Sequence, residues 1–153
     1  MRTISKGTEP NTLSQWKRQN PNGHYKDLPA LVRQSIRHAC TTEQFYLCAY
    51  CCAEITGDNQ SCHNEHVEAQ SGSAHRTLDH QNIVASCETP KQCDKAHGHQ
   101  PLPLTPLMDE CETEFKFYLS GRIEGLTERA QQSVEILNLG DNHNNNRDII
   151  ETR

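Results

Sequence analysis

Apolar residues recur at helical spacing between residues 28 and 40. The spaced positions are Leu28, Leu31, Val32, Ile36 and Ala39. This pattern predicts an amphipathic helix, and Asp27 stands where an N-cap would bond the first free backbone amides. Before it, residues 1–26 are polar and are interrupted by Pro10, Pro21 and Gly23, which predicts an irregular arm.

A second set of elements is expected towards the C-terminus. The β-prone run 115–119, the Ser-Gly pair at 120–121 and the residues that follow it predict two strands joined by a turn. Thr127 is a candidate cap for a helix that carries Ala130, Val134 and Leu137. Three asparagines at 144–146 predict another helix start. Because the chain ends at Arg153 soon after it, we expect the natural protein to continue.

Composition changes the picture, because apolar residues make up 33% of the chain and aromatic residues 5%. A chain with so few apolar residues forms only a small hydrophobic core, so its fold needs further stabilisation, for example by a bound metal ion. Six of the eight cysteines and six of the nine histidines lie within residues 45–99. We therefore divide the chain into a basic arm and helix (1–40), a zinc-stabilised core (41–100) and a C-terminal β-hairpin and helical appendage (101–153).

The cysteine spacing predicts a structural zinc site. Cys48 and Cys51 form a CxxC knuckle, and Cys87 and Cys93 can supply the other two thiolates of a tetrahedral site. The second pair is the weaker signal, since five residues separate its members, and the possible substitutes are Cys52, Cys62, His63 and His99. The N-terminus has no apolar leader, so we expect a cytoplasmic protein whose cysteines bind metal and do not form disulfides. No apolar run is long enough to span a membrane. Reduced, buried thiols are the simpler alternative.

Between the two cysteine pairs lies a candidate catalytic group. Glu65 stands directly before His66, and Asn82 follows sixteen residues later. A histidine can take a proton from water near neutral pH, and a carboxylate can hold a divalent cation that stabilises charge on phosphate. This combination indicates hydrolysis of a phosphodiester. His63, His75 and His80 belong to the same region and are expected at the surface.

In this order, the segments CAYC, EHVEAQSGSAH, LDHQNIVASC and CDKAHG resemble the zinc-knuckle HNH endonucleases. The resemblance implies an α+β fold with a small ββα-metal core and flanking helices. It implies that His66 is the general base, that Asn82 braces the catalytic loop and that Glu65 binds the catalytic ion. The third motif residue is Asp94 by position, with His97 as the second choice. If a helix begins near Asp94, both can share a face. Carboxylate ligands then imply Mg²⁺ or Mn²⁺.

The wider pattern resembles the PtuB-type HNH proteins of Septu anti-phage systems, which also serve as retron effectors. That resemblance implies nucleic acid as the substrate and a PtuA-like ABC-type ATPase as the partner. The charge distribution agrees, because residues 1–40 carry seven Lys and Arg against two acidic residues, whereas the whole chain has a net charge of -5. An acidic remainder needs a bound metal or a basic partner to hold a polyanion.

Two other functions remain open. The chain can be a catalytically silent zinc-binding adaptor within a larger complex, or a module that only binds nucleic acid. A pure binding module would not need the Glu65-His66 pair beside Asn82, and it would be expected to be basic. Cleavage of DNA or RNA, tested with and without Mg²⁺, distinguishes these alternatives from a nuclease.

Overall fold

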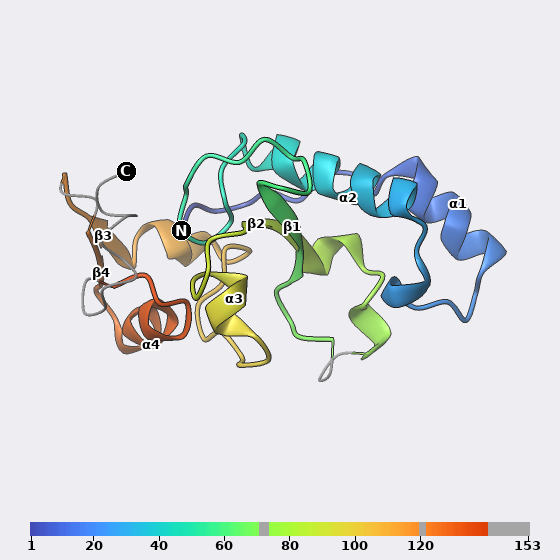
Figure 1. Ribbon diagram of the computed structural model, residues 1–153. Helices are drawn as coiled ribbons and strands as arrows, with labels where there is room; N and C mark the ends of the chain where they lie inside the picture. Colours follow the sequence, from blue (N-terminus) through green and yellow to red (C-terminus); the bar gives the residue numbers. More distant parts are fainter. Residues whose placement is uncertain (71–73, 120–121, 141–153) are drawn as a thin grey trace.

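The computed structural model describes residues 1–70, 74–119 and 122–140 as an α+β arrangement of short helices and two small sheets (Figure 1). The α-helices are α1 (Asn11–Gln19), α2 (Ala30–Glu43), α3 (Asp94–His97) and α4 (Glu128–Ile136). The strands are β1 (Cys62–His66), β2 (Ile83–Cys87), β3 (Phe115–Phe117) and β4 (Ile123–Gly125). Four 3₁₀ turns, η1 (Tyr25–Asp27), η2 (Ala74–Arg76), η3 (His80–Asn82) and η4 (Asp109–Glu112), complete the order.

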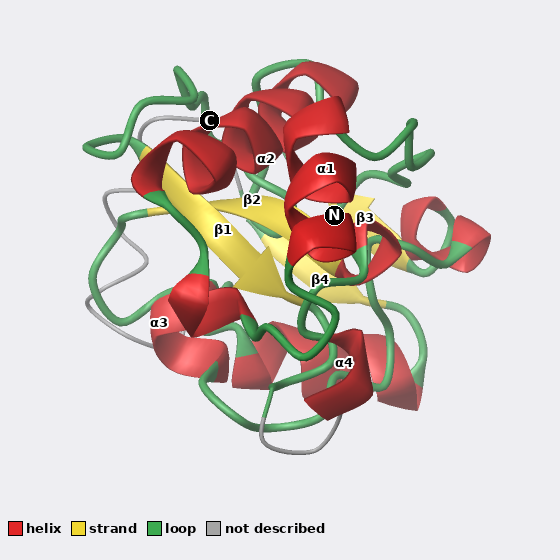
Figure 2. Ribbon diagram, turned by 90° about the vertical axis from the view of Figure 1, so that its right-hand side faces the viewer, coloured by secondary structure: helices red, strands yellow, loops and turns green. Residues whose placement is uncertain are grey.

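The central sheet is the antiparallel pair β1–β2 (Figure 2). Its register sets Glu65 opposite Val84 and His66 opposite Ile83. All five residues of β2 are buried, because α2 packs against both strands of the pair. Helix α3 is the next element after β2 in the chain, and residues 88–93 connect the two. In Figure 1, α1 and α2 lie towards one end of the molecule, whereas β3, β4 and α4 lie at the other end.

The arm 1–26 contains a helix, so the prediction that it is irregular throughout was wrong. Helix α1 begins directly after Pro10 and buries Leu13 completely. A proline at the start of a helix loses no backbone hydrogen bond, because the first amides of a helix have no partner within it. Pro10 therefore starts this helix, although its presence in the sequence suggested a break.

Helix α2 confirms the helix predicted over 28–40, but not its cap. The helix starts at Ala30 after Pro29, and no side chain caps it. The Asp27 carboxylate accepts a hydrogen bond from the His24 backbone amide, 3.0 Å away, and so closes η1. Leu31, expected on the apolar face, is 76% exposed. A proline is tolerated at the helix start, where its fixed φ suits the helix and its missing amide hydrogen would have no partner within it.

The C-terminal elements agree with the prediction where they are described. Strands β3 and β4 pair antiparallel, and the Thr127 hydroxyl accepts a hydrogen bond from the Ala130 amide as the cap of α4. Gly125 is required here, because a Cβ atom would lie 2.4 Å from the Gln131 backbone nitrogen. The turn at 120–121 and the helix start predicted at 144–150 fall outside the described residues.

The N-terminal arm is tied to distant parts of the chain. The Ile4 amide donates to the Pro106 carbonyl at 2.8 Å, and the Thr3 amide donates to Glu112 at 3.0 Å. Lys6 is buried, and its ammonium donates to Glu43, to the Ile83 carbonyl and to the Cys40 sulfur. The division into three segments remains a prediction. Among the described residues, no helix has the length and apolar character needed to cross a membrane.

Candidate metal centres and active site

Four buried cysteines form one cluster around a point between the CxxC turn and the end of β2. The Cys48 and Cys93 sulfurs are 3.8 Å apart, those of Cys51 and Cys87 are also 3.8 Å apart, and those of Cys87 and Cys93 are 3.7 Å apart. A zinc ion about 2.3 Å from four sulfurs at tetrahedral corners would separate them by about 3.8 Å. The cluster therefore has the dimensions of a zinc site and could bind this ion.

The local backbone explains why these four thiols meet. Cys87 ends β2, and its amide donates to the Cys48 sulfur at 3.3 Å. Cys93 adopts a positive φ of 51° directly before α3, which turns the chain back towards the knuckle. Hydrogen bonds that Cys87 accepts from the other thiols lower its pKa, whereas those that Cys51 donates to Cys48 and Cys87 raise the pKa of Cys51. Such crowded sulfurs can ionise together only with a cation among them.

The alternative zinc ligands lie elsewhere. Cys52 is half-exposed and stands outside the cluster. The Cys62 sulfur lies 3.9 Å from the Thr41 hydroxyl. His63 contacts acidic side chains, and His99 lines a cleft at the surface.

A second group of potential metal ligands is His63, Glu65 and Asp94. His63 and Glu65 are alternate residues of β1, so both side chains leave the same face of the strand, and Asp94 begins α3. One ligand atom of each lies within 4.8 Å of the others. His63 Nε2 is 2.5 Å from Asp94 Oδ2, and His63 Nδ1 is 2.7 Å from Glu88 Oε1. Burial disfavours the charged ring, but the hydrogen bond and charge of Asp94 outweigh it and raise the pKa of His63.

Glu65 is held from its buried side by two donors. Its Oε1 accepts from the Tyr50 hydroxyl at 3.3 Å and lies 2.8 Å from His97 Nδ1. Burial raises the pKa of Glu65 to about 7, although the hydrogen bond of His97 opposes the shift. Asp94 behaves oppositely: despite burial, hydrogen bonds from His63 and Glu65 lower its pKa. A divalent cation close to both carboxylates would favour the charged form of each.

His66 points to the other face of β1 and is fixed as one tautomer. Its Nε2 lies 2.9 Å from the Thr77 carbonyl oxygen, which can only accept, so Nε2 carries the hydrogen. Nδ1 is then the basic nitrogen, and the Gln70 amide donates to it at 3.2 Å. The Tyr25 ring packs edge-on against the imidazole, with 4.6 Å between the ring centroids. Burial lowers the pKa of His66, which favours the neutral ring.

Asn82 fastens the loop that follows β1. Its Nδ2 donates to the Glu68 carbonyl at 3.1 Å, and its Oδ1 accepts from the Glu68 amide at 2.9 Å. The Asn82 carbonyl also accepts from the Val67 amide at 3.0 Å. Three bonds therefore hold the backbone directly after His66, and the role of Asn82 as a brace remains a prediction.

Several of these side chains face one open cleft of about 490 Å³. Its lining residues are Asn64, Glu65, His66, Ala69, Gln70, Asp94, Lys95, Gly98 and His99. His97 is buried behind Glu65 and is not among the lining residues. The two alternatives for the third motif position thus occupy different places. Asp94 lines the cleft, whereas His97 is buried and contacts Glu65 on the side away from the cleft. Their roles remain predictions.

Sequence reasoning missed three contributors. His63 could have been recognised as a partner of Glu65 from its position two residues earlier on one strand. Tyr50 and the Thr77 carbonyl carry no sequence signal, because they reach the site through tertiary packing. The expectation of a surface position was wrong for His80, which is 2% exposed because the Lys6 arm and Glu43 pack around it. His75 is exposed as expected.

Comparison with known proteins gives one informative relative. No family model matches the chain. A protein of Escherichia coli, whose name describes it as a candidate HNH endonuclease of retron Ec83, is 34% identical over 99 residues. The match supports a relationship to HNH-type nucleases. It covers 57% of this chain but only 37% of the relative, so the chain corresponds to little more than a third of that protein's length.

Proposed function

We propose that this protein is a metal-dependent HNH nuclease that hydrolyses phosphodiester bonds of nucleic acid. The observation that carries the proposal is the shared cleft, which is lined by Glu65, by Asp94 and by His66, whose Nδ1 is the basic nitrogen. In this proposal β1, β2 and α3 form a ββα-metal core, and the four cysteines hold a structural zinc ion. The named relative supports the same reaction class.

Glu65 and Asp94 would hold the catalytic ion, with His63 beside them. The donor set suits a divalent cation, because the three side chains offer ligand atoms within 4.8 Å of one another and burial disfavours a charged Glu65 that has no cation beside it. Hard carboxylate oxygens favour Mg²⁺ or Mn²⁺. When bound, such an ion stabilises the negative charge that develops on the phosphate. His97 and Tyr50 act behind Glu65 by fixing the orientation of its carboxylate.

His66 acts as the general base. The Thr77 carbonyl holds its Nε2–H, so the lone pair of Nδ1 receives the proton of the attacking water. The Gln70 amide shows that a hydrogen-bond donor fits at this position, and Gln70 is an exposed residue that water can replace. The resulting hydroxide forms the new bond to phosphorus while the bond to the leaving oxygen breaks. Asn82 keeps the loop after His66 in place during this step.

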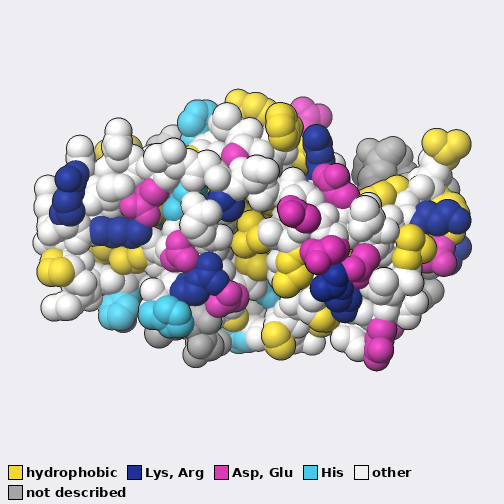
Figure 3. All heavy atoms as spheres, turned by 180° about the vertical axis from the view of Figure 1, so that it is seen from behind, with side chains coloured by type: hydrophobic (Ala, Val, Ile, Leu, Met, Phe, Trp, Pro, Cys, Tyr) yellow, Lys and Arg dark blue, Asp and Glu magenta, His cyan; other side chains and the backbone are white. Residues whose placement is uncertain are grey.

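The biological setting that we propose is anti-phage defence together with an ABC-type ATPase. The relative's name associates it with a retron, and the chain is acidic overall with a basic N-terminal quarter. On the face seen in Figure 3, acidic and basic side chains are mixed. Phosphate backbones bind to surfaces that concentrate Lys and Arg, so a partner would supply the remaining affinity.

The decisive test is cleavage of plasmid DNA and of RNA with Mg²⁺, with Mn²⁺ and with EDTA, in the presence and absence of the ATPase. We expect metal-dependent cleavage that falls about a hundredfold or more in His66→Ala, because a positioned general base is lost. His75→Ala is the matched control, since His75 is exposed outside the cleft lining. Equal activity of His66→Ala and the wild type would refute the proposal.

A further inference from the structure

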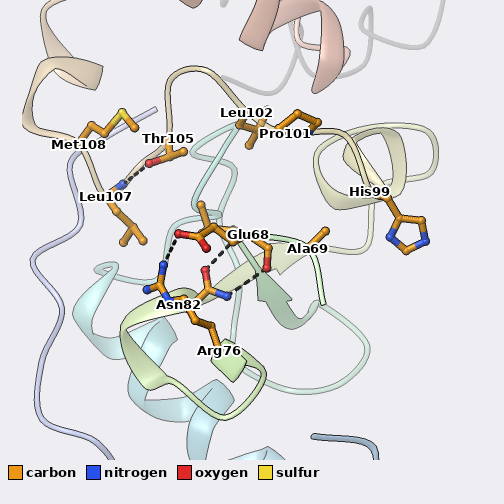
Figure 4. Close-up of a pocket in the computed structure, with 11 residues that line it drawn as sticks. Glu68, Ala69, Arg76, Asn82, His99, Pro101, Leu102, Thr105, Leu107 and Met108 are labelled. Atoms are coloured by element: carbon orange, nitrogen blue, oxygen red, sulfur yellow. Dashed lines mark hydrogen bonds and ion pairs between the residues drawn. The ribbon is translucent and has the colours of Figure 1, made fainter. Parts of the chain in front are cut away.

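A cavity of about 690 Å³ lies next to the proposed catalytic cleft. It opens between the loop after β1 and the proline-rich segment 101–108, as Figure 4 shows. Ala69 and His99 line both this cavity and the catalytic cleft, so the two spaces are adjacent. A substrate strand with its phosphate in the cleft would therefore bring a neighbouring nucleotide to the mouth of the cavity.

The two walls of the cavity differ in chemistry. On one side, Leu102, Leu107 and Met108 offer an apolar surface. Across from them lie Glu68 and Arg76, which form an ion pair. The volume falls within the range of about 300–1,000 Å³ that small-ligand pockets occupy. A flat ring with apolar faces and a polar edge matches such walls.

We infer that this cavity receives an unstacked nucleobase of the substrate strand, and that guanine fits it best. Enzymes that bind an extruded base stack it between apolar side chains and bond to its polar edge. Guanine offers N–H donors to the Glu68 carboxylate and the acceptors O6 and N7 to the Arg76 guanidinium. Thymine and uracil present no amino group to that carboxylate. The inference rests on the proposed nuclease function, which identifies the strand as the ligand.

The polar groups are held in position before a base arrives. Arg76 Nε donates to Asp79 at 2.9 Å, and the backbone of Glu68 is fixed at both its amide and its carbonyl by Asn82. Fixed donors and acceptors lose little conformational freedom on binding, so they add selectivity. Asn82 thus links the proposed catalytic loop to the wall of the cavity.

The first test measures binding without cleavage. Eight-nucleotide single strands that contain one guanine, one uracil or one abasic site are titrated with the zinc-loaded full chain, without added Mg²⁺ or Mn²⁺, by fluorescence anisotropy. We expect the guanine strand to bind about tenfold more tightly than the abasic strand, within the discrimination of one bidentate base contact. Glu68→Gln should remove most of the preference for guanine over uracil.

Filling the cavity provides the matched comparison. Met108→Trp places a large side chain at a half-buried lining position, and Leu102→Trp does so at a buried one. Leu126→Trp is the control, since Leu126 is 53% exposed and lies outside the cavity lining. Zinc content and thermal melting verify that each variant folds. We expect the first two variants, but not the control, to bind guanine and abasic strands equally.

The binding results test the base pocket independently of the nuclease function. If the wild type binds guanine and abasic strands equally, or if Met108→Trp folds and keeps the full preference, the base pocket is refuted even if cleavage is observed. If the preference exists and disappears in the filled variants but no strand is cleaved with any metal, the pocket stands and the nuclease function fails. With both intact, cleavage sites should cluster beside guanines.

Discussion

Two clusters of potential metal ligands differ in how much of them water can reach. The four cysteines are all buried, whereas His63 and Asp94 are partly exposed, and Asp94 lines a cleft together with Glu65. Structural zinc sites are closed by four protein ligands, and catalytic sites keep a position open for water or substrate. The comparison teaches that one short hairpin and the turn after it can serve both purposes, because Cys93 and Asp94 are adjacent residues that point to different centres.

The largest effect is expected from removing a zinc ligand. Structural zinc contributes about 10–16 kcal/mol of apparent binding free energy, which is comparable with or larger than the stability of a small domain. We expect Cys48→Ser to lose zinc and its cooperative thermal transition. Cys52→Ser is the matched control from the same knuckle, because Cys52 lies outside the cluster. Zinc analysis and circular dichroism check both variants, and a folded, zinc-loaded Cys48→Ser would contradict the prediction.

The next effect separates the two alternatives for the third motif position. Asp94→Ala should lose cleavage by about a hundredfold or more with Mg²⁺ or Mn²⁺, because it removes an oxygen ligand from the cleft. His97→Ala should lose only about tenfold, since it removes a group that orients Glu65. Both variants should keep their zinc. An active Asp94→Ala beside an inactive His97→Ala would show that the imidazole is the ligand.

A smaller effect is expected for His63. It contacts Asp94 and lies within 4.8 Å of the ligand atom of Glu65, so it binds the ion directly or fixes a ligand. We expect His63→Ala to weaken Mn²⁺ binding about tenfold in an electron paramagnetic resonance titration. His75→Ala should leave the affinity unchanged. Unchanged Mn²⁺ binding in His63→Ala would remove His63 from the cluster.

The smallest effect is expected at Glu114, whose carboxylate belongs neither to the cysteine cluster nor to the cleft. Hydrogen bonds from Arg129 and Thr127 lower the pKa of Glu114 to about 2. A lowered pKa in the folded state stabilises the protein above the unfolded value of about 4.3, and the contribution disappears as the pH falls through about 2. Glu114→Gln should therefore lower the Tm by about 2 °C or less. The difference should be constant from pH 8 to 5.5, with zinc and activity intact. A difference that changes within that range would refute the assignment.

The sequence predicts a group of ligands well when its members lie close together along the chain, and poorly when they meet only through tertiary packing. Cys48 and Cys51 are recognisable because a turn of fixed length holds them, and the structure brings Cys87 and Cys93 to them as predicted. Tyr50 and the Thr77 carbonyl were not predictable, because no local pattern shows which strand or ring they will meet. The helix of the arm was missed because Pro10 can either end or start a helix, and the buried side chain of Leu13 decides between the two.

The contacts of the N-terminal arm also determine when the protein can finish folding during synthesis. Thr3 and Ile4 pair with Glu112 and Pro106, more than a hundred residues later, so these bonds must wait until the ribosome has released that segment. The cysteine cluster closes with Cys93 and can take up its ion earlier. During that interval the buried partners of the arm are open to solvent, and a nascent chain stalled before residue 106 would hold its zinc while it still exposed them to chaperones and proteases.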